Sequence, residues 1–583
     1  MSIQARVRFP AALAAIALLA LLGGEIARFS LWTTSDEPAH LAAAREWRHG
    51  PGMVSNFEHP VLMKVLAGVF LPHEKPAMEI DETRAGRAPM PFVFLGLALV
   101  TGLLGRALAG NAAGLAAAAL VAIEPTLRGH GTLVQSDVLV TFFLVAAALA
   151  LELAARGGKR TMLIASGVLY GFAMASKYSA FPFLAVFAVA AMVRLASGRF
   201  SSRVNGKKPA GPFLLLGKSL SPPILGSVSM LVAIALATLF LVQFLAFAGT
   251  SDDAFRAAIA HEFKGLPQEH AAVALARTFP KAIAAYGSGL LFVQGVAGPG
   301  ERFNYFLGEI SGKGHPLYFP VALGIKLTAA AVLASVAALL AAGLGLFRGA
   351  RLRRLLFVRA ALPAALGGAY LAAACASNVN IGVRHALPAV PFLLVAAAAA
   401  GKTLLARRPR AFRAALLGVV LLAAGESALR LGREISFGNL LAGGPSGVSA
   451  ILSDSNVDWG QEQGRVFERV GHGGLGRVGI TSLIVDESGA RAVGIAGQAM
   501  TPDAPVDTVF FSRFLWDLAA GIENNTESWP KFVWLRGWLP ALRHGLEARA
   551  VSVEPFGDAQ LLLRLREAAP ATAPPFATPA PTR

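Results

Sequence analysis

The stretch that decides the fold is residues 222–248, PPILGSVSMLVAIALATLFLVQFLAFA, which contains no Asp, Glu, Lys or Arg. About 20 apolar residues are enough for an α-helix to cross the hydrocarbon core of a bilayer, so this run predicts a transmembrane helix. Similar runs recur through the first three quarters of the chain. The 583 residues are 55% hydrophobic and only 15% charged, whereas about a quarter of the residues in a typical soluble domain are charged. The sequence therefore predicts an α-helical polytopic membrane protein.

Basic clusters alternate with the apolar runs. We predict about eleven transmembrane helices, near residues 9–30, 89–108, 111–127, 135–154, 161–176, 180–195, 222–248, 317–346, 357–376, 386–401 and 411–427. The clusters on one side are Arg6/Arg8, Arg106, Arg156/Lys159/Arg160, Arg194 to Lys208, Arg348 to Arg359 and Lys402 to Arg413. Because Lys and Arg are enriched in cytoplasmic loops, this side is predicted to face the cytoplasm of a bacterial inner membrane. The first run lacks a small-residue cleavage site, which favours a retained span over a signal peptide.

The composition changes after the last apolar run. We predict a transmembrane domain at 1–427 with outer loops at 31–88 and 249–316, a soluble domain at 428–567 and a disordered Pro/Ala/Thr-rich tail at 568–583. Short apolar runs at Val506–Phe511 and Ala559–Leu565 are typical of strands, so the soluble domain is predicted to be α/β. The position of the basic loops places this domain in the periplasm.

Several function classes are excluded or disfavoured. The net charge of +18 lies in short clusters between apolar runs, and not on one soluble face, so nucleic-acid binding is not expected. No GxGxxG follows a strand, which argues against a nucleotide-sugar site of Rossmann type. Gly401-Lys402-Thr403 resembles the end of a P-loop, but Ala396 occupies the position of its first glycine.

The first candidate site follows the first apolar run, in TTSDEPAHLAAAREW (residues 33–47). Asp36 or Ser35 could be the N-cap of a helix, with acids favoured in its first turn. That interpretation explains one acid better than two, because an acid pair at the bilayer edge costs desolvation. Asp36 and Glu37 are therefore candidate catalytic residues.

A second candidate lies in NFEHPVLMKVLAG, residues 56–68. Glu58, His59 and Lys64 interrupt an otherwise amphipathic helix in the same outer loop. Glu58 and His59 could bind a divalent metal, although two adjacent ligands are a weak signal. A helix that lies on the membrane surface explains the pattern equally well.

Further motifs continue in order along the chain. They are QSDVLVTFF (135–143), GFAMASKYSA (171–180), FNYFLGEISGKGHPLYFPVALGIKLT (303–328), NIGVRHALPAVPF (380–392), FGNLLAGGP (437–445) and LSDSNVDWGQEQGRV (452–466). Together with DEPAH and NFEHPVLMKVL, they resemble the C-type membrane glycosyltransferases that use polyprenyl-phosphate sugars, in particular the group of protein O-mannosyltransferases and aminoarabinose transferases. The resemblance covers roughly residues 30–470. It departs at Leu327-Thr328, where the family has a proline after the lysine, so the role of Lys326 stays open.

The resemblance implies an inverting transfer of a sugar from a polyprenyl-phosphate donor to a hydroxyl or phosphate acceptor. It implies Asp36 as the base and Glu37 and Asp137 as residues that shape the site. Glu37 is also expected to raise the pKa of Asp36 by like-charge repulsion. The residues expected at the donor phosphate, at outer span ends, are Lys177, Arg384 and His385. The planar fork of an arginine suits phosphate, whereas the alternative for each cation is a lipid-facing anchor.

The densest polar cluster outside the spans contains Asp454, Asn456, Asp458 and Gln461. These residues could cover the site and contact the acceptor, but we favour a structural role, with Asp458 as a helix cap. No cofactor is required by the resemblance, and the expected partners are the lipid-linked donor, membrane lipids and the acceptor. Two alternatives remain: a transporter or flippase of lipid-linked intermediates, and a non-catalytic membrane scaffold.

Overall fold

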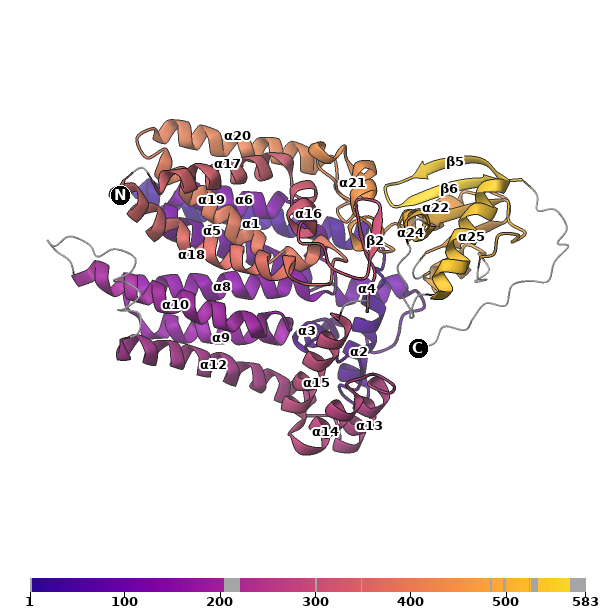
Figure 1. Cartoon of the computed structure of the whole chain (residues 1–583), viewed down its shortest axis with the longest axis horizontal. Coiled ribbons are helices and arrows are strands. Elements are labelled where there is room, and N and C mark those ends of the chain that lie inside the picture. Colours follow the sequence, from indigo (N-terminus) through magenta and orange to yellow (C-terminus); the bar gives the residue numbers. More distant parts are fainter. Residues whose placement is uncertain are drawn as a thin grey trace.

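Long helices lie side by side in one bundle, and a smaller unit built around a β-sheet packs against one end of it (Figure 1). The computed structural model describes residues 3–203, 221–298, 301–347, 349–482, 485–495, 500–523, 525 and 533–566. The tail predicted at 568–583 lies outside the described residues. The bundle consists of α1 (Ile3–Ser30), α5 (Met90–Ala109), α6 (Asn111–Ile123), α8 (Ser136–Gly157), α9 (Arg160–Ser176), α10 (Ala180–Arg203), α12 (Pro222–Phe247), α17 (Ala329–Gly345), α18 (Ala350–Cys375), α19 (Ala389–Leu404) and α20 (Pro409–Ala428).

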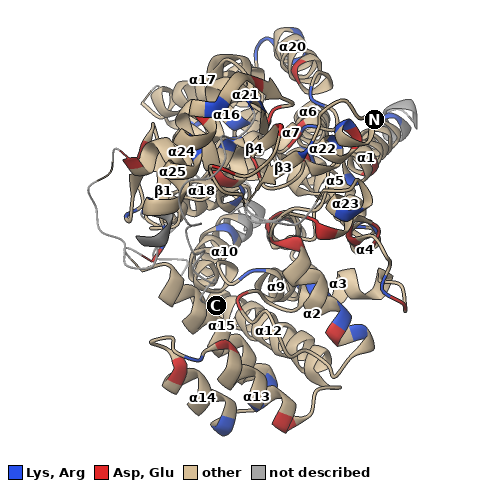
Figure 2. Ribbon diagram, turned by 90° about the vertical axis from the view of Figure 1, so that its right-hand side faces the viewer, with Lys and Arg blue, Asp and Glu red and all other residues tan. Residues whose placement is uncertain are grey.

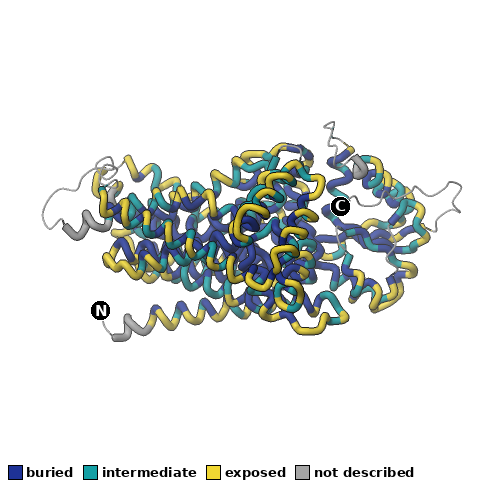
Figure 3. The backbone as a smooth tube through the Cα atoms, turned by 90° about the horizontal axis from the view of Figure 1, so that it is seen from below, coloured by how far each residue is buried: buried dark blue, intermediate teal, exposed yellow. Residues whose placement is uncertain are grey.

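Within the described residues, seven helical segments are long and apolar enough to cross a membrane: Arg8–Ser30, Glu79–Ala109, Ser136–Gly157, Ala180–Ser197, Pro222–Phe247, Ala350–Cys375 and Pro409–Ala428. Three shorter apolar helices, α6, α17 and α19, lie among them. Large apolar side chains such as Phe244, Leu340 and Leu422 are exposed, as expected where lipid replaces water. Exposed positions follow the outer helices of the bundle (Figure 3). The predicted helical polytopic membrane protein is confirmed, and the count of eleven spans remains a prediction.

The predicted span at 317–346 is wrong as a single helix. It is divided into α16 (Tyr318–Lys326) and α17, and Leu327 between them is extended. The carboxylate of Glu124 accepts hydrogen bonds from the backbone N–H of Thr328 at 3.1 Å and from its hydroxyl at 3.0 Å. An acid at this position satisfies donors at the start of α17, so a residue 204 positions earlier in the chain stabilises the break.

Short elements gather at the end of the bundle that faces the sheet (Figure 1). From the first outer loop come α2 (Glu37–His49), α3 (Leu62–Phe70) and α4 (Glu79–Gly86), and α7 (Pro125–His130) follows α6. The second loop supplies α13 (Asp252–Glu262), α14 (Glu269–Thr278), α15 (Lys281–Val296) and the hairpin β1 (Asn304–Phe306) and β2 (Glu309–Ser311). The 3-10 turn η1 (Val383–Ala386) follows α18. These elements bring distant segments of the chain together.

The C-terminal unit contains a four-stranded sheet in the order β3-β4-β6-β5. Its elements are η2 (Leu440–Ala442), α21 (Pro445–Ile451), η3 (Asp454–Asn456), α22 (Gln463–Gly471), β3 (Val478–Thr481), α23 (Glu487–Ala492), β4 (Thr508–Ser512), α24 (Arg513–Glu523), α25 (Val533–Arg549), β5 (Ala550–Phe556) and β6 (Gln560–Leu565). β3 and β4 are parallel, and the other neighbours are antiparallel. β4 is buried at all five positions, which makes it the centre of this unit.

Candidate active site

An ion pair joins two of the motifs that carry the resemblance, DEPAH near the start of the chain and NIGVRHALPAVPF at 380–392. Nη1 of Arg384, on η1, donates to Oδ2 of Asp36 at 2.8 Å, and the two residues are 348 positions apart. Asp36 lies immediately before α2, and 35% of its side chain is exposed, against 9% for Arg384. The predicted base and the predicted phosphate ligand are therefore in direct contact. Arg384 is largely buried, because its guanidinium lies against the ring of Trp459.

Trp459 lies next to both members of this pair. The guanidinium centre of Arg384 is 4.0 Å from the centroid of the Trp459 ring. The backbone N–H of Ser35 donates to the carbonyl oxygen of Trp459 at 2.9 Å, and that of Trp32 donates to Gln461 O at 2.9 Å. The segment before Asp36 is thus tied by its backbone to the segment that carries Trp459.

Asp36 is a carboxylate that stays ionised. Burial raises its pKa, but the charges of Arg384 and then His40, with the hydrogen bond from Arg384, outweigh burial and hold the pKa below its usual value. The expectation that Glu37 raises this pKa is wrong, because the carboxylate of Glu37 is neutralised by another residue.

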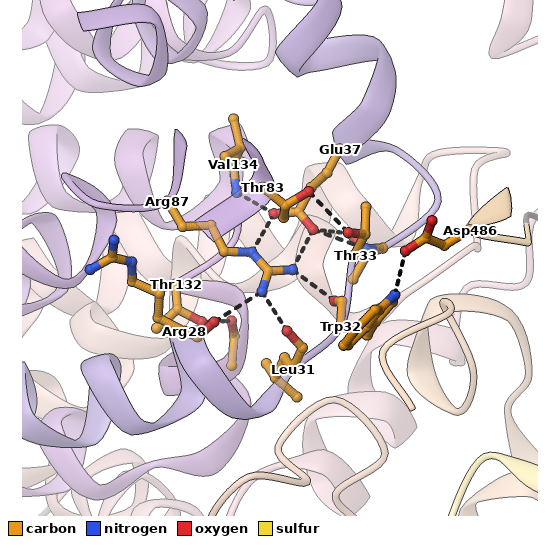
Figure 4. A network of polar contacts seen from close by, with 12 residues as sticks. Arg28, Leu31, Trp32, Thr33, Glu37, Thr83, Arg87, Thr132, Val134 and Asp486 are labelled. Atoms are coloured by element: carbon orange, nitrogen blue, oxygen red, sulfur yellow. Dashed lines mark hydrogen bonds and ion pairs between the residues drawn. The ribbon is translucent and has the colours of Figure 1, made fainter. Parts of the chain in front are cut away.

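That residue is Arg87, and neither side chain has exposed surface. Nε of Arg87 donates to Oε1 of Glu37 at 2.7 Å, and the backbone N–H groups of Thr34 and Val134 donate to the same carboxylate at 2.9 Å each (Figure 4). Burial raises the pKa of Glu37, but the charge and the hydrogen bond of Arg87 outweigh burial and hold the pKa below its usual value. Glu37 thus fixes the start of α2, with its carboxylate fully enclosed.

Asp137 and Lys177 form a second ion pair near the first. Asp137 lies in the first turn of α8, and Lys177 lies between α9 and α10. The Lys177 side chain is 14% exposed and the Asp137 side chain 3% exposed. The negative charge of Asp137 also acts on Arg384. The structure therefore brings Lys177 to the site with its ammonium already paired.

Glu58 and His59 lie on a turn that holds them rigidly. Nζ of the buried Lys64 donates to the carbonyl oxygen of His59 at 2.8 Å and also to that of Asn56. Asn56 has φ +58°, a left-handed conformation that is costly for a residue with a side chain. Burial, and then the charge of Asp36, raises the pKa of Glu58. The turn presents a second carboxylate whose pKa is shifted in the opposite direction to that of Asp36.

Two histidines of the site, His59 and His385, are neutral at neutral pH. Burial lowers the pKa of His59 and His385, and nearby Lys177 and Arg384 lower both further. The rings of His40 and His59 meet edge to face, with centroids 4.6 Å apart. His385 therefore contributes a neutral imidazole to the site and not the positive charge that a phosphate ligand was expected to carry.

The predicted polar cluster at 454–461 contains one residue that electrostatically influences, and is influenced by, the ion pair, and three residues whose hydrogen bonds hold the surrounding loops. Asp454 is half-buried, and the charges of Arg384 and Asp36 both act on it. Asn456 accepts from the Val383 N–H at 2.9 Å, so it supports η1 from behind. Asp458 and Gln461 are also buried: Asp458 accepts from Gln560 Nε2 at 2.9 Å, and Gln461 accepts from Trp459 N at 2.6 Å. These contacts lie within the fold, but Asp458 is not the expected helix cap, because the next helix, α22, begins only at Gln463.

Four further residues of the site were missed: Arg87, His40, Arg302 and Trp459. Arg302, whose charge acts on Asp36, Glu58 and Asp454, directly precedes the matched block that begins at residue 303. His40 lies in the motif at 33–47 and Trp459 in the motif at 452–466, so the sequence could have indicated both. Arg87 had no signal, because its partner is 50 residues away.

Among the described side chains, no group of three His, Cys, Asp or Glu residues is arranged to hold a metal ion. The role of Lys326 is now defined by its contacts. Its buried Nζ donates to the carbonyl oxygens of Asn456 at 2.6 Å and Ile435 at 2.7 Å, so it supports the loop beneath η1.

Comparison with known proteins points to one class. Residues 90–211 match the family model described as dolichyl-phosphate-mannose-protein mannosyltransferase. This match bears out the resemblance of the chain to the polyprenyl-phosphate-dependent membrane glycosyltransferases. No curated protein matches the chain at a significant level.

Several solved structures are similar to the chain. ArnT from Cupriavidus metallidurans bound to undecaprenyl phosphate is 12% identical over 94% of this chain and 97% of that chain, with a TM-score of 0.45. The oligosaccharyltransferase AglB from Archaeoglobus fulgidus, in complex with an inhibitory peptide and a dolichol-phosphate, is 12% identical over 95% and 74%, with a TM-score of 0.47. The S. cerevisiae protein O-mannosyltransferase Pmt1-Pmt2 complex is 15% identical over 42% and 35%, with a TM-score of 0.32, so the chain spans about a third of that protein.

Proposed function

We propose that this chain is an inverting membrane glycosyltransferase that moves a sugar from a polyprenyl-phosphate donor to an acceptor on the extracytoplasmic side. The observation that carries the proposal is the contact between Asp36 and Arg384. Glycosyl transfer needs a base for the acceptor and a cation for the departing phosphate, held close together. The pair supplies both.

In the proposed reaction, Asp36 takes the proton of the acceptor hydroxyl. The acceptor oxygen forms a bond to the anomeric carbon, and the bond from that carbon to the phosphate oxygen breaks. Polyprenyl phosphate leaves with the electron pair, and Arg384 stabilises its developing charge. Within the described residues, Nε of Arg384 is buried without a hydrogen-bond partner, so donor capacity remains for a phosphate oxygen.

The donor also needs a place for its hydrocarbon chain. A cavity of about 520 Å³ lies between α10 and α18 and is lined almost entirely by apolar side chains, including Val186, Val189 and Leu362. α10 begins three residues after Lys177, and η1 follows the end of α18, so the helices that line the cavity lead to the cations of the site. We propose that the polyprenyl chain occupies this cavity while its phosphate reaches Arg384.

The test is turnover by purified protein with polyprenyl-phosphate sugars as donors. Asp36→Asn keeps the shape of the side chain and an acceptor for Arg384, so donor binding should hardly change. Because the change removes the counter-charge of Arg384, turnover is compared per folded protein, with the melting temperature measured in parallel. Loss of a positioned base typically lowers the rate by about 10²–10⁴-fold. Asp507→Asn is the matched control, because Asp507 is 42% exposed and paired with Arg477 in the C-terminal unit. If Asp36→Asn keeps more than about a tenth of wild-type turnover, Asp36 is not the base.

The sugar and the acceptor need a separate experiment. Mass spectrometry of lipid-linked sugars and surface glycans in a deletion strain should reveal an accumulated lipid-linked sugar together with a missing glycan residue. Unchanged pools of both would contradict the proposed transfer.

A further inference from the structure

Arg384 is a buried cation that uses few of its hydrogen-bond donors. Nη1 donates to Asp36, whereas Nε has no partner within the described part of the chain. A guanidinium carries five N–H donors, and burying such a charge is costly without compensation. The ring of Trp459 supplies part of that compensation at 4.0 Å, because the face of an aromatic ring attracts a cation. This contact holds the guanidinium without occupying an N–H group.

Trp459 also determines where Asp36 lies. Its carbonyl oxygen accepts from the N–H of Ser35, the residue immediately before Asp36, at 2.9 Å. The side chain of Trp459 thus holds one member of the ion pair, and its backbone holds the other. Burial of Trp459 restricts the orientation of its ring relative to its backbone, so one residue connects the base and the cation.

The C-terminal unit fixes Trp459 in turn. Only 2% of its surface is exposed. The preceding residue, Asp458, accepts from the hydroxyl of Ser512, at the end of β4, and from Nε2 of Gln560, at the start of β6. Gln461 closes the loop on the other side by accepting the Trp459 N–H at 2.6 Å. The central strands of the sheet therefore anchor the loop that touches the ion pair.

We infer that Trp459 is a positioning residue, which holds Arg384 by its ring face so that the N–H groups of Arg384 stay available for the donor phosphate, and which sets Asp36 through Ser35. The inference rests on the proposed function in one respect, the identity of the ligand as a phosphate. The geometry itself, the ring on the guanidinium, does not depend on it.

The first experiment measures binding of undecaprenyl phosphate to the purified full-length protein. Trp459→Leu should raise the Kd roughly 2- to 30-fold, the range of a cation–π contact, whereas Trp459→Phe keeps an aromatic face and should stay within about 3-fold of wild type. In an Arg384→Gln background, Trp459→Leu should add less than about 2-fold, because the cation is gone. Trp516→Leu is the control, since it removes a ring from Arg543 inside the C-terminal unit, away from the site.

The second experiment is a melting-temperature cycle over wild type, Trp459→Leu, Arg384→Gln and the double variant. It needs no donor, and the two changes should be non-additive because their groups touch. Additive changes would overturn the contact. Equal weakening of undecaprenyl phosphate binding by Leu and Phe, in step with lost stability, would overturn the positioning role. If wild type binds no polyprenyl phosphate, the proposed function fails, and the melting cycle alone decides whether ring and guanidinium interact.

Discussion

At the scale of single residues, Arg87 and Arg384 are two buried guanidinium groups beside consecutive carboxylates, and their surroundings differ. Arg87 donates to both oxygens of Glu37 and also to the carbonyl oxygens of Leu31 at 2.7 Å and Trp32 at 2.8 Å. The N–H groups of Arg87 are therefore occupied by hydrogen bonds within the protein. Arg384 instead lies on an aromatic ring, and its Nε has no partner among the described residues, which is why we propose Asp36–Arg384, and not Glu37–Arg87, as the catalytic pair.

Replacing Arg384 should therefore weaken use of the donor. Arg384→Gln should raise the donor KM roughly 10- to 100-fold, the range for a lost hydrogen bond to a charged group. Arg384→Lys should recover only part of the loss, because a point charge cannot copy paired hydrogen bonds. Steady-state kinetics at varied donor concentration checks this. A normal donor KM in both variants would exclude Arg384 as the phosphate ligand.

Replacing Glu37 should instead destabilise the protein. Glu37→Gln leaves the fully buried Arg87 without a counter-charge, which typically costs about 3–5 kcal/mol. We expect a large drop in melting temperature, with activity lost in proportion to the folded fraction. Glu487→Gln, at an exposed pair with Arg491, should change stability by less than about 0.5 kcal/mol. A stable but inactive Glu37→Gln variant would mean that Glu37 takes part in the chemistry.

At the scale of elements, the segment between η3 and α22 connects the sheet to the bundle. Its two buried acids, Asp458 and Glu462, both contact the segment at the start of β6. Burial raises the pKa of Asp458 to about 6, although hydrogen bonds from Ser512, Gly460 and Gln560 oppose the shift. The connection therefore contains a carboxyl group that folding prefers in its protonated form.

The stability of this connection should depend on pH. The folded pKa of Asp458, about 6, lies above the usual value of 3.8, so the folded state binds its proton more tightly. The stabilisation is fully present below about pH 4 and is lost as pH rises through about 6. A two-unit shift corresponds to about 3 kcal/mol as an order of magnitude. Melting temperatures between pH 4 and 7.5 should fall more steeply for wild type than for Asp458→Asn, and parallel profiles would contradict the assignment.

The sequence predicts these elements unevenly. Most predicted spans coincide with one helix, because apolar runs of membrane length leave little alternative, and two short apolar runs predicted β4 and β6. The break at Leu327 was not predicted, because it depends on Glu124, which is distant in the sequence and contacts Thr328 only in the folded protein. The candidate site was likewise predicted only where local sequence indicates it. Motifs identified Asp36 and Arg384, whereas the contacts of Arg87 and the burial of Arg384 arise from segments that are distant in the chain.

At the scale of the whole molecule, ion pairs lie at both ends of the bundle. Asp36–Arg384 and Asp137–Lys177 lie at the end that carries the C-terminal unit, and Figure 2 shows basic and acidic segments mixed across this face. At the other end, Arg194 binds Glu152 at 2.6 and 2.8 Å. The basic segment at 156–160 lies at that opposite end too, since Arg156 also pairs with Glu152. The rule that keeps basic loops inside therefore predicts that the site and the C-terminal unit face outside.

Reporter fusions check this orientation. A reporter that is active only in the cytoplasm should be silent when fused after Arg566, which follows β6, and active when inserted beside Arg408, between α19 and α20. The expected reason is the retention of basic loops on the cytoplasmic side. Activity of the first fusion would reverse the proposed orientation and place the site in the cytoplasm.

The separation of 348 residues between Asp36 and Arg384 has a consequence for biosynthesis. A ribosome inserts Asp36 with the first helices, and the guanidinium that pairs with it leaves the ribosome much later, followed by Trp459 and finally by Gln560. A nascent chain that stops anywhere before residue 560 has membrane helices but lacks at least one of these partners. We therefore expect products that terminate between the last membrane helix and residue 560 to be inserted and inert, so that sugar transfer requires translation through the start of β6.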